Sequence, residues 1–332
     1  DNLGNLDPAS VQHLGDTVLA AIRAVAEADL PDMSDGSRVY VDALGAAMLH
    51  WPAWWTPIFA GLALAAIVRA ARRRARAHDP APRALRLRRG LAFPALVAGP
   101  AAVGATLTAV LAWATDAEVP GHAAPLAARV ALWTGVLAAS GALAGALARP
   151  DPDARAWLWL GPWPWLAAIA AVTAVAVPGA SVGVLPPVAV VALLSLWACR
   201  RGHGAEAMSA SSLPSGWIVV VGLALPAVMW LQATVRVEAI FGLGPAAAGT
   251  LALLASLLAP LWLGLARLRR PLVAGLALAC AAAAATTVNT PAYSEARPRR
   301  LSLLYHLDAD AGAARWITGA DEPLPPSLRT VA

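Results

Sequence analysis

Residues 91–115 read LAFPALVAGPAAVGATLTAVLAWAT and contain no charged side chain. A helix that crosses the hydrocarbon core of a bilayer needs about 20 mostly apolar residues, and its backbone polar groups must pair within the helix. This stretch is long enough and apolar enough to meet both conditions. It therefore predicts a transmembrane helix.

Seven further apolar stretches surround this one. The eight predicted spans cover residues 52–68, 91–115, 126–148, 157–178, 182–199, 213–235, 245–266 and 271–288. The fifth is short and carries Pro186 and Pro187, so the fourth and fifth could instead form a re-entrant pair. We expect a mainly α-helical fold, a polytopic membrane bundle of about eight transmembrane helices with a short α/β flank before it and a small β segment after it.

The overall composition agrees with a protein surrounded by lipid. Of the 332 residues, 59% are hydrophobic and only 14% are charged. With glycine added, the apolar share is well above the roughly 45–50% of a soluble domain. These values exclude a disordered chain, a coiled coil and an ordinary soluble enzyme. The two cysteines, Cys199 and Cys280, lie in separate apolar stretches, which excludes a disulfide framework and a paired metal site.

Arginine placement predicts the orientation, since all basic residues are arginines and short cytoplasmic loops are enriched in them. Alternate connections carry Arg69, Arg72, Arg73, Arg74, Arg76, Arg83, Arg86, Arg88 and Arg89, then Arg149 and Arg155, then Arg200 and Arg201, then Arg267, Arg269 and Arg270. The intervening connections contribute only Arg129 and Arg236. Eight spans with this alternation place both termini on the non-cytoplasmic side.

Tryptophans gather near the predicted span ends, which is typical of an aromatic belt at the membrane interfaces. Those at predicted outer ends are Trp51, Trp54, Trp55, Trp113 and Trp230, and those near inner ends are Trp157, Trp159, Trp197, Trp217 and Trp262. General core filling is the alternative interpretation.

The Arg69–Arg89 loop predicts contact with anionic lipid, because each cation beside a membrane contributes roughly 1 kcal/mol of attraction. No aromatic residues are interleaved with these arginines, so we expect no nucleic-acid partner.

Residues 1–50 do not form a span. Asp7 can cap a helix and Pro8 suits its first turn, so an amphipathic helix is predicted over 8–29. Its apolar face carries Val11, Leu14, Val18, Ile22 and Val25 at helical spacing. Residues 38–42 read as a short strand that leads toward the first span.

Residues 289–332 form the second flank. Leu301, Leu303, Tyr305 and Leu307 alternate with more polar neighbours, residues 308–312 supply a turn, and residues 314–318 can return as a second strand. The sequence predicts a β-hairpin that is too small to be stable alone and must pack on other protein.

No catalytic, metal-binding or cofactor-binding residue is assigned from the residues themselves. His13, His50, His78, His122, His203 and His306 show no metal-ligand spacing. The spans contain almost no charge: Arg129 can extend outward from the third span, and Arg236 and Glu238 lie at the outer end of the sixth. This scarcity argues against a proton-coupled transporter or an intramembrane protease, and favours an anchor or scaffold.

The opening segment, DNLGNLDPASVQHLGD at residues 1–16, resembles a stretch of the zinc-dependent metallopeptidase family 28, in the branch of the endoplasmic-reticulum metallopeptidase and the vacuolar membrane protease. Residues 39–45, followed by Trp51 and Pro52, are similar to the family's entry into its membrane region. Residues 298–305, PRRLSLLY, resemble the start of its C-terminal lumenal or periplasmic domain.

The resemblance implies that this chain is the C-terminal membrane part of a zinc aminopeptidase-type exopeptidase. The family binds two zinc ions through His, Asp, Glu, a further acidic residue and a second His, with another Glu as general base. Asp1 matches the residue just after the last ligand His, so every ligand would lie upstream. We therefore expect no zinc and no peptidase activity in this chain by itself.

The expected organisation is a peptidase remnant over 1–50, an eight-span membrane domain over 51–288 and an extracytoplasmic tail over 289–332. The resemblance implies a bacterial inner membrane with periplasmic flanks, or the lumen of the endoplasmic reticulum or vacuole in eukaryotic relatives. The expected partners are the lipid bilayer, the missing peptidase domain and, through that domain, peptides. The alternative function is a polytopic transporter or a lipid-binding scaffold without peptidase activity.

Overall fold

The computed structural model describes residues 8–27, 37–43, 47–77, 82–117, 124–149, 154–200, 216–291, 293, 303–308 and 313–318. Internal contacts divide the chain into two compact units, Ser34–Thr290 and a second one made of Asp1–Met33 with Pro291–Ala332. Each unit is described separately below.

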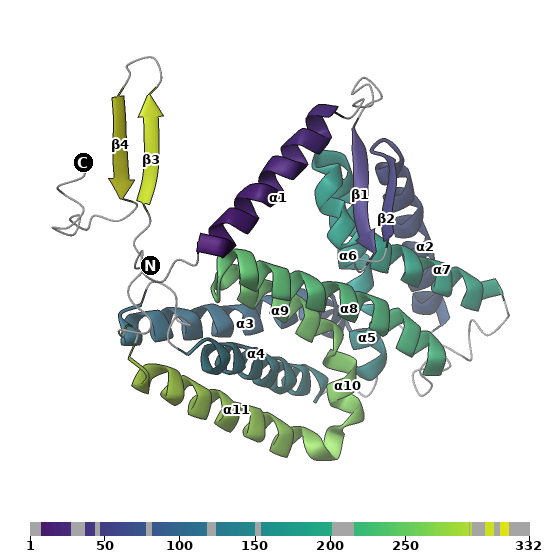
Figure 1. Ribbon diagram of the computed structural model, residues 1–332. Coiled ribbons are helices and arrows are strands. Elements are labelled where there is room, and N and C mark those ends of the chain that lie inside the picture. Colours follow the sequence, from purple (N-terminus) through teal and green to yellow (C-terminus); the bar gives the residue numbers. More distant parts are fainter. Residues whose placement is uncertain are drawn as a thin grey trace. The chain divides into compact units, whose positions relative to one another are not determined.

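The first unit is mainly helical. Its elements are β1 (Arg38–Ala43), β2 (Ala47–Pro52), α2 (Trp55–Ala77), α3 (Arg83–Thr115), α4 (Pro125–Ala148), α5 (Ala154–Leu160), α6 (Pro162–Ala176), the 3-10 helix η3 (Pro178–Gly183), α7 (Leu185–Arg200), α8 (Gly216–Phe241), α9 (Pro245–Leu257), α10 (Ala259–Gly264) and α11 (Ala266–Asn289). Figure 1 shows their order, coloured along the chain.

Several of these helices could span a membrane. Within the described residues, five segments are long and apolar enough: Trp55–Arg73, Arg83–Thr115, Pro125–Ala148, Trp157–Ala176 and Ala266–Asn289. Leu185–Leu196 and Pro245–Leu257 are shorter apolar helices. The prediction of a mainly helical, membrane-type fold is confirmed at this level.

Two predicted spans are interrupted rather than continuous. Residues 157–178 divide at Gly161 into α5 and α6, where the Gly161 amide donates to Trp157 O at 2.6 Å and Pro162 and Pro164 follow. Residues 245–266 divide at Leu258, just before Pro260. Proline lacks the amide hydrogen that a continuous helix needs and restricts the residue before it, which explains both breaks.

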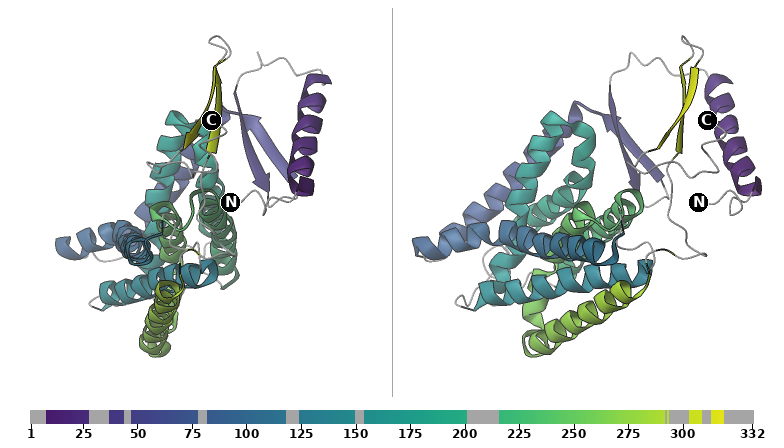
Figure 2. Two further views of the ribbon diagram at one scale, coloured as in Figure 1. Left: turned by 60° about the vertical axis from the view of Figure 1, so that its left-hand side comes forward. Right: turned by 90° about the vertical axis from the view of Figure 1, so that its left-hand side faces the viewer.

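Helix α4 lies at the centre of one group of helices. It contacts α3, α9 and α11, and Figure 1 shows it between α3 and α11. Both views in Figure 2 show α11 at the edge of this group. Fully buried side chains at these contacts are small or aliphatic, among them Leu132, Val136, Ala248 and Leu251.

A second group forms around α2, which packs against α6 and α7. Its buried core includes Ala63, Ile67, Trp163, Ala167 and Val188. The antiparallel hairpin β1–β2 contacts η3 and α2. Its register pairs Val39 with Trp51 and Val41 with Leu49.

The strand predicted over 38–42 is confirmed as β1, but its partner β2 was not predicted. Residue 52 was expected to begin the first span, whereas it ends β2, and α2 begins at Trp55. The difference has a local cause. Val39 and Val41 are buried at alternate positions, and Trp51 donates its indole hydrogen to Thr56 Oγ1 at 2.9 Å, which fixes the end of the hairpin to the first turn of the helix.

The second unit contains one helix and one hairpin among its described residues. Helix α1 covers Pro8–Glu27, as predicted from its amphipathic spacing, while residues 28 and 29 lie outside the described residues. Strands β3 (Leu303–Asp308) and β4 (Ala313–Thr318) are antiparallel, with Leu303 opposite Thr318 and Asp308 opposite Ala313. The predicted C-terminal hairpin is confirmed.

Candidate functional site

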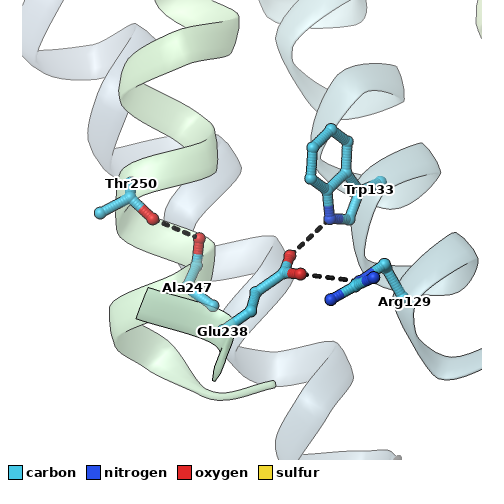
Figure 3. Close-up of polar contacts among 5 residues, drawn as sticks. All are labelled: Arg129, Trp133, Glu238, Ala247 and Thr250. Carbon is cyan, nitrogen blue, oxygen red and sulfur yellow. Dashed lines mark hydrogen bonds and ion pairs between the residues drawn. The ribbon is translucent and has the colours of Figure 1, made fainter. Parts of the chain in front are cut away.

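A buried carboxylate joins α8 to α4. Glu238 is only 5% exposed, although it lies in the last turns of a helix. Its Oε2 lies 2.7 Å from Arg129 Nε, and its Oε1 accepts a hydrogen bond of 2.5 Å from Trp133 Nε1. Figure 3 shows both α4 side chains pointing toward the carboxylate. The contact is a charge-assisted bridge between two helices.

The local backbone explains why Glu238 is available for this bridge. Helix α8 continues to Phe241, beyond the predicted limit at residue 235, so Glu238 lies in the helix and not in a loop. Gly242 then adopts φ 72°, a left-handed conformation that glycine tolerates, and α9 begins at Pro245. In α9, Thr250 donates to Ala247 O at 3.0 Å, so its hydroxyl is used within its own helix (Figure 3).

The sequence predicted that Arg129 extends outward from the third span. Its side chain is indeed half exposed, but the guanidinium also meets Glu238, a contact across about a hundred residues that no local pattern indicated. Glu238 Oε2 has the ion-pair distance without hydrogen-bond geometry to Arg129. The pair is therefore half buried, with its acidic member shielded and its basic member at the surface.

The arginines of residues 69–89 lie in helices, whereas the sequence predicted a loop that carries them. Helix α2 continues to Ala77 and α3 already begins at Arg83, so these arginines lie on two helical extensions. Arginine and alanine are good helix formers, which lets both helices continue past the apolar stretches.

Arg88 and Arg269 both contact the C-terminal end of α4. Arg88 Nη2 donates to Ala146 O at 2.8 Å and to Leu147 O at 3.0 Å, in the last turn of α4. The Arg269 guanidinium lies over Gly145, where an added Cβ would stand 2.6 Å from Arg269 Cζ. Cations at the C-terminal end of a helix are favoured by its unpaired carbonyls.

The tryptophans divide into exposed and buried sets. Trp54, Trp55 and Trp113 are exposed, as an aromatic belt requires. The belt interpretation is wrong for Trp157, Trp159 and Trp230, which are buried between helices. Their wide rings fill gaps that alanine-rich neighbours leave open.

Buried indoles need a hydrogen-bond acceptor, and only some have one. Trp230 Nε1 donates to Gly183 O at 2.8 Å. Trp157 Nε1 and Trp163 Nε1 have no hydrogen-bond partner. Leaving such a buried donor unpaired costs about 1–3 kcal/mol. Trp157 and Trp163 therefore each carry this cost.

An apolar pocket adjoins one of these indoles. It has a volume of about 30 Å³ and opens to the surroundings between α2, α6 and α7. Its lining residues are Ile67, Ala70, Ala71, Leu160, Trp163, Pro164, Val191 and Ser195. The gap beside Trp157, lined by Phe93 and Leu96 among others, has a volume of about 0 Å³ and therefore cannot hold a water molecule.

The histidines that the structure describes lie in three different elements. His13 is exposed on α1, His50 packs against Tyr40 with ring centroids 5.9 Å apart, and His306 pairs with Arg315 in the β3–β4 register. His78, His122 and His203 lie outside the described residues. Within the described residues, no three His, Cys, Asp or Glu side chains are grouped closely enough to hold a metal ion.

Comparisons of the chain with protein-family models, with curated proteins and with solved structures gave no match.

Proposed function

We propose that this chain is the membrane-anchoring region of a zinc-dependent exopeptidase of the metallopeptidase family 28 type. Its eight spans would be α2, α3, α4, α5–α6, α7, α8, α9–α10 and α11. Both flanks would lie on the non-cytoplasmic side, where a peptidase domain joins the N-terminal flank. The zinc, the general base and the peptide substrate belong to that domain.

The observation that carries the anchor role is the close packing of helices through glycine. A Cβ added at Gly104 would lie 2.8 Å from Ala248 Cβ, and one at Gly141 would lie 2.9 Å from Val273 Cγ2. Real Cβ atoms do not approach so closely, so these positions need a residue without a side chain. Small residues allow such contacts between membrane helices. Packing of this kind favours an anchor over a transporter, which would need a polar cavity between its spans.

Contacts between helix ends support the predicted layout. The first turns of α3 and the last turn of α4, both predicted to be cytoplasmic, are joined by Arg88. The first turn of α4 and the end of α8, both predicted to be non-cytoplasmic, are joined by Arg129 and Glu238. Trp230 and Gly183, both predicted to lie near the non-cytoplasmic side, are likewise joined by a hydrogen bond. Each contact pairs positions to which the arginine rule gives the same side.

Cysteine labelling tests the layout. In a background with Cys199 and Cys280 replaced by alanine, single cysteines are placed at Ser37, Asp116 and Thr290, and in a second set at Arg83 and Arg149. We expect a membrane-impermeant maleimide to label the first set from the non-cytoplasmic side and the second set only after permeabilisation. Labelling of Ser37 and Thr290 from opposite sides would overturn the proposal.

Two further measurements test the peptidase assignment. The gene upstream of the Asp1 codon should encode a peptidase domain that ends in a His-Thr pair a few codons before it. An unrelated domain there contradicts the family assignment. The chain itself, with added zinc and an aminoacyl reporter, should give no turnover above a metal-free control, and measurable turnover would show that a catalytic site lies within it.

A further inference from the structure

The β1–β2 hairpin exposes apolar side chains on its outer face. Val39 and Val41 are buried, so the face that carries them packs on the protein. Tyr40 and Met48 belong to the opposite face, and both are more than half exposed. An antiparallel sheet with one face in water carries mainly polar residues on that face. The exposed aromatic and thioether side chains of this hairpin therefore indicate surroundings other than bulk water.

The base of the hairpin is fixed to the start of α2. The amide of Ala53 donates to Ser37 O at 2.9 Å, which closes the two strands at this end. Trp51 donates its indole hydrogen to Thr56 Oγ1, and its ring packs edge-on against Phe59 with centroids 6.4 Å apart. The hairpin base therefore lies at the level of the first turns of α2, the end of a helix that is apolar enough to span a membrane.

The apolar part of α2 is short for a membrane span. Only about 14 residues separate Trp55 from Arg69, which corresponds to roughly 21 Å along the helix axis, against about 30 Å for the hydrocarbon core. Such a mismatch has a cost in free energy. Apolar residues directly before the helix reduce it, and residues 43–54 contain no charged side chain. Exposed Leu49 and Trp54 belong to this stretch, so the apolar surface continues from α2 into the hairpin.

The backbone limits how deep the hairpin can lie. In the described part of the chain, each of its strands pairs only with the other, so each has an outer edge with unpaired backbone groups. The hydrocarbon core offers no water to bond such groups, which excludes strand edges that face lipid at that depth. The headgroup region contains both water and apolar surface, and Trp and Tyr are enriched there. It is the one layer that suits both the side chains and the backbone of this hairpin.

We propose that the β1–β2 hairpin lies in the headgroup region of the leaflet at which α2 begins, with Tyr40, Met48 and Leu49 against phospholipid. The only charged residues of its strands are Arg38 and Asp42, which have opposite signs. The contact therefore depends on apolar surface and not on lipid charge, unlike the attraction expected for the arginines of residues 69–89. This proposal depends neither on the peptidase assignment nor on which side of the membrane the hairpin occupies.

Depth-dependent quenching in the full chain tests the proposal. In the cysteine-free background, single cysteines at Tyr40, Met48 or Leu278 are labelled with bimane, and the protein is reconstituted in phosphatidylcholine vesicles. The lipid carries a nitroxide either on the headgroup or at carbon 12 of the acyl chain. Leu278 is an exposed position in the middle of α11 and serves as the deep control. A bimane–glutathione conjugate in the aqueous phase is the reference for water.

The expected result is a difference in depth between the two elements. Bimane at positions 40 and 48 should be quenched at least about twofold more by the headgroup nitroxide than by the chain nitroxide, and bimane at position 278 should show the reverse. Both hairpin positions are exposed, so the labelled variants should keep the thermal unfolding midpoint of the original chain.

Three results would overturn the proposal. Positions 40 and 48 that are quenched by neither lipid, like the aqueous reference, place the hairpin in water or under protein. Stronger quenching by the chain nitroxide places it in the hydrocarbon. Absence of quenching at position 278 as well shows that the chain is not inserted in the bilayer.

A change of lipid charge tests the cause of the contact. Replacing half of the phosphatidylcholine by phosphatidylglycerol should change headgroup quenching at Met48 by less than about twofold, because the hairpin strands have no net charge. Headgroup quenching that appears only with phosphatidylglycerol would show that charge holds the hairpin at the membrane, and the proposed apolar contact would be wrong.

Discussion

Helices α4 and α11 are alike in sequence and different in environment. Both have 24 residues, both are rich in alanine, and their most apolar windows have nearly the same mean hydropathy. Yet 50% of that window is buried in α4 and only 6% in α11. Helix α4 has protein on several sides, whereas α11 touches mainly α4 itself. Hydropathy thus measures how well a helix tolerates lipid, not how much lipid it meets.

The largest contrast should come from truncating one leucine on each helix. Leu132 on α4 is 0% exposed and Leu278 on α11 is 72% exposed. Leu132→Ala should lower the free energy of unfolding by about 3 kcal/mol, because it leaves a cavity between helices. Leu278→Ala should change it by less than about 0.5 kcal/mol. Denaturant titration in mixed micelles measures both, and equal effects would contradict the difference in burial.

Enlarging a glycine tests the same contrast from the opposite direction. Gly141→Leu on α4 places atoms against Val273 and the ring of Trp262, and should cost about 2 kcal/mol through overpacking. A Cβ added at Gly275 on α11 meets nothing within 4 Å, so Gly275→Leu should be neutral or slightly stabilising, because leucine is the better helix former. Thermal unfolding of the two variants checks this. Destabilisation by Gly275→Leu would indicate a further contact on the open face of α11.

Removing a charge should have a smaller effect on the end of α4. Arg129→Ala removes this cation from the buried Glu238 carboxylate, which keeps its hydrogen bond from Trp133. Breaking a fully buried pair costs about 3–5 kcal/mol, and the half-exposed Arg129 reduces this to about 1.5 kcal/mol. The double variant Arg129→Ala with Glu238→Gln should recover part of the loss, because the glutamine is neutral and can still accept from Trp133. No recovery would mean that the pair does not couple α4 to α8.

The smallest expected effect concerns single hydroxyl groups. Ser140 on α4 is fully buried and donates to Ala255 O of α9 at 3.2 Å, while Thr286 on α11 bonds only to Ala282 O of its own helix. Ser140→Ala should destabilise the protein by about 0.6 kcal/mol, an average value for hydrogen bonds between membrane helices. Thr286→Ala should be neutral within the error of the measurement, and a larger loss for Thr286→Ala than for Ser140→Ala would reverse the comparison.

Local sequence patterns predicted the type of most elements. The apolar run at residues 91–115 gives α3, the spacing of Val18 and Ile22 gives α1, and the alternation from Leu303 to Leu307 gives β3. The errors concern limits and breaks. Arginines extend α2 and α3 beyond the apolar runs, prolines divide two spans, and β2 extends to residue 52, which was expected to begin a helix.

The candidate sites were much less predictable. Arg129 and Glu238 were recognised as rare charges near predicted span ends, but their contact depends on how α4 and α8 approach each other. The sequence did not distinguish Trp163 from the other tryptophans. A tryptophan in an apolar run has the same sequence neighbours whether or not its ring nitrogen is hydrogen-bonded. Arg88 was predicted to contact anionic lipid together with the other arginines of residues 69–89. In the structure it donates hydrogen bonds to carbonyl oxygens in the last turn of α4.

The sequence by itself determined that the chain is mainly helical and suited to a membrane, because length, hydropathy and helical spacing are properties of a segment and its nearest neighbours. Only the tertiary structure decided which apolar helix is enclosed, which arginine serves the protein and which indole lacks an acceptor. These properties depend on atoms that come together from distant segments. A segment's own composition does not contain that information, as α4 and α11 demonstrate.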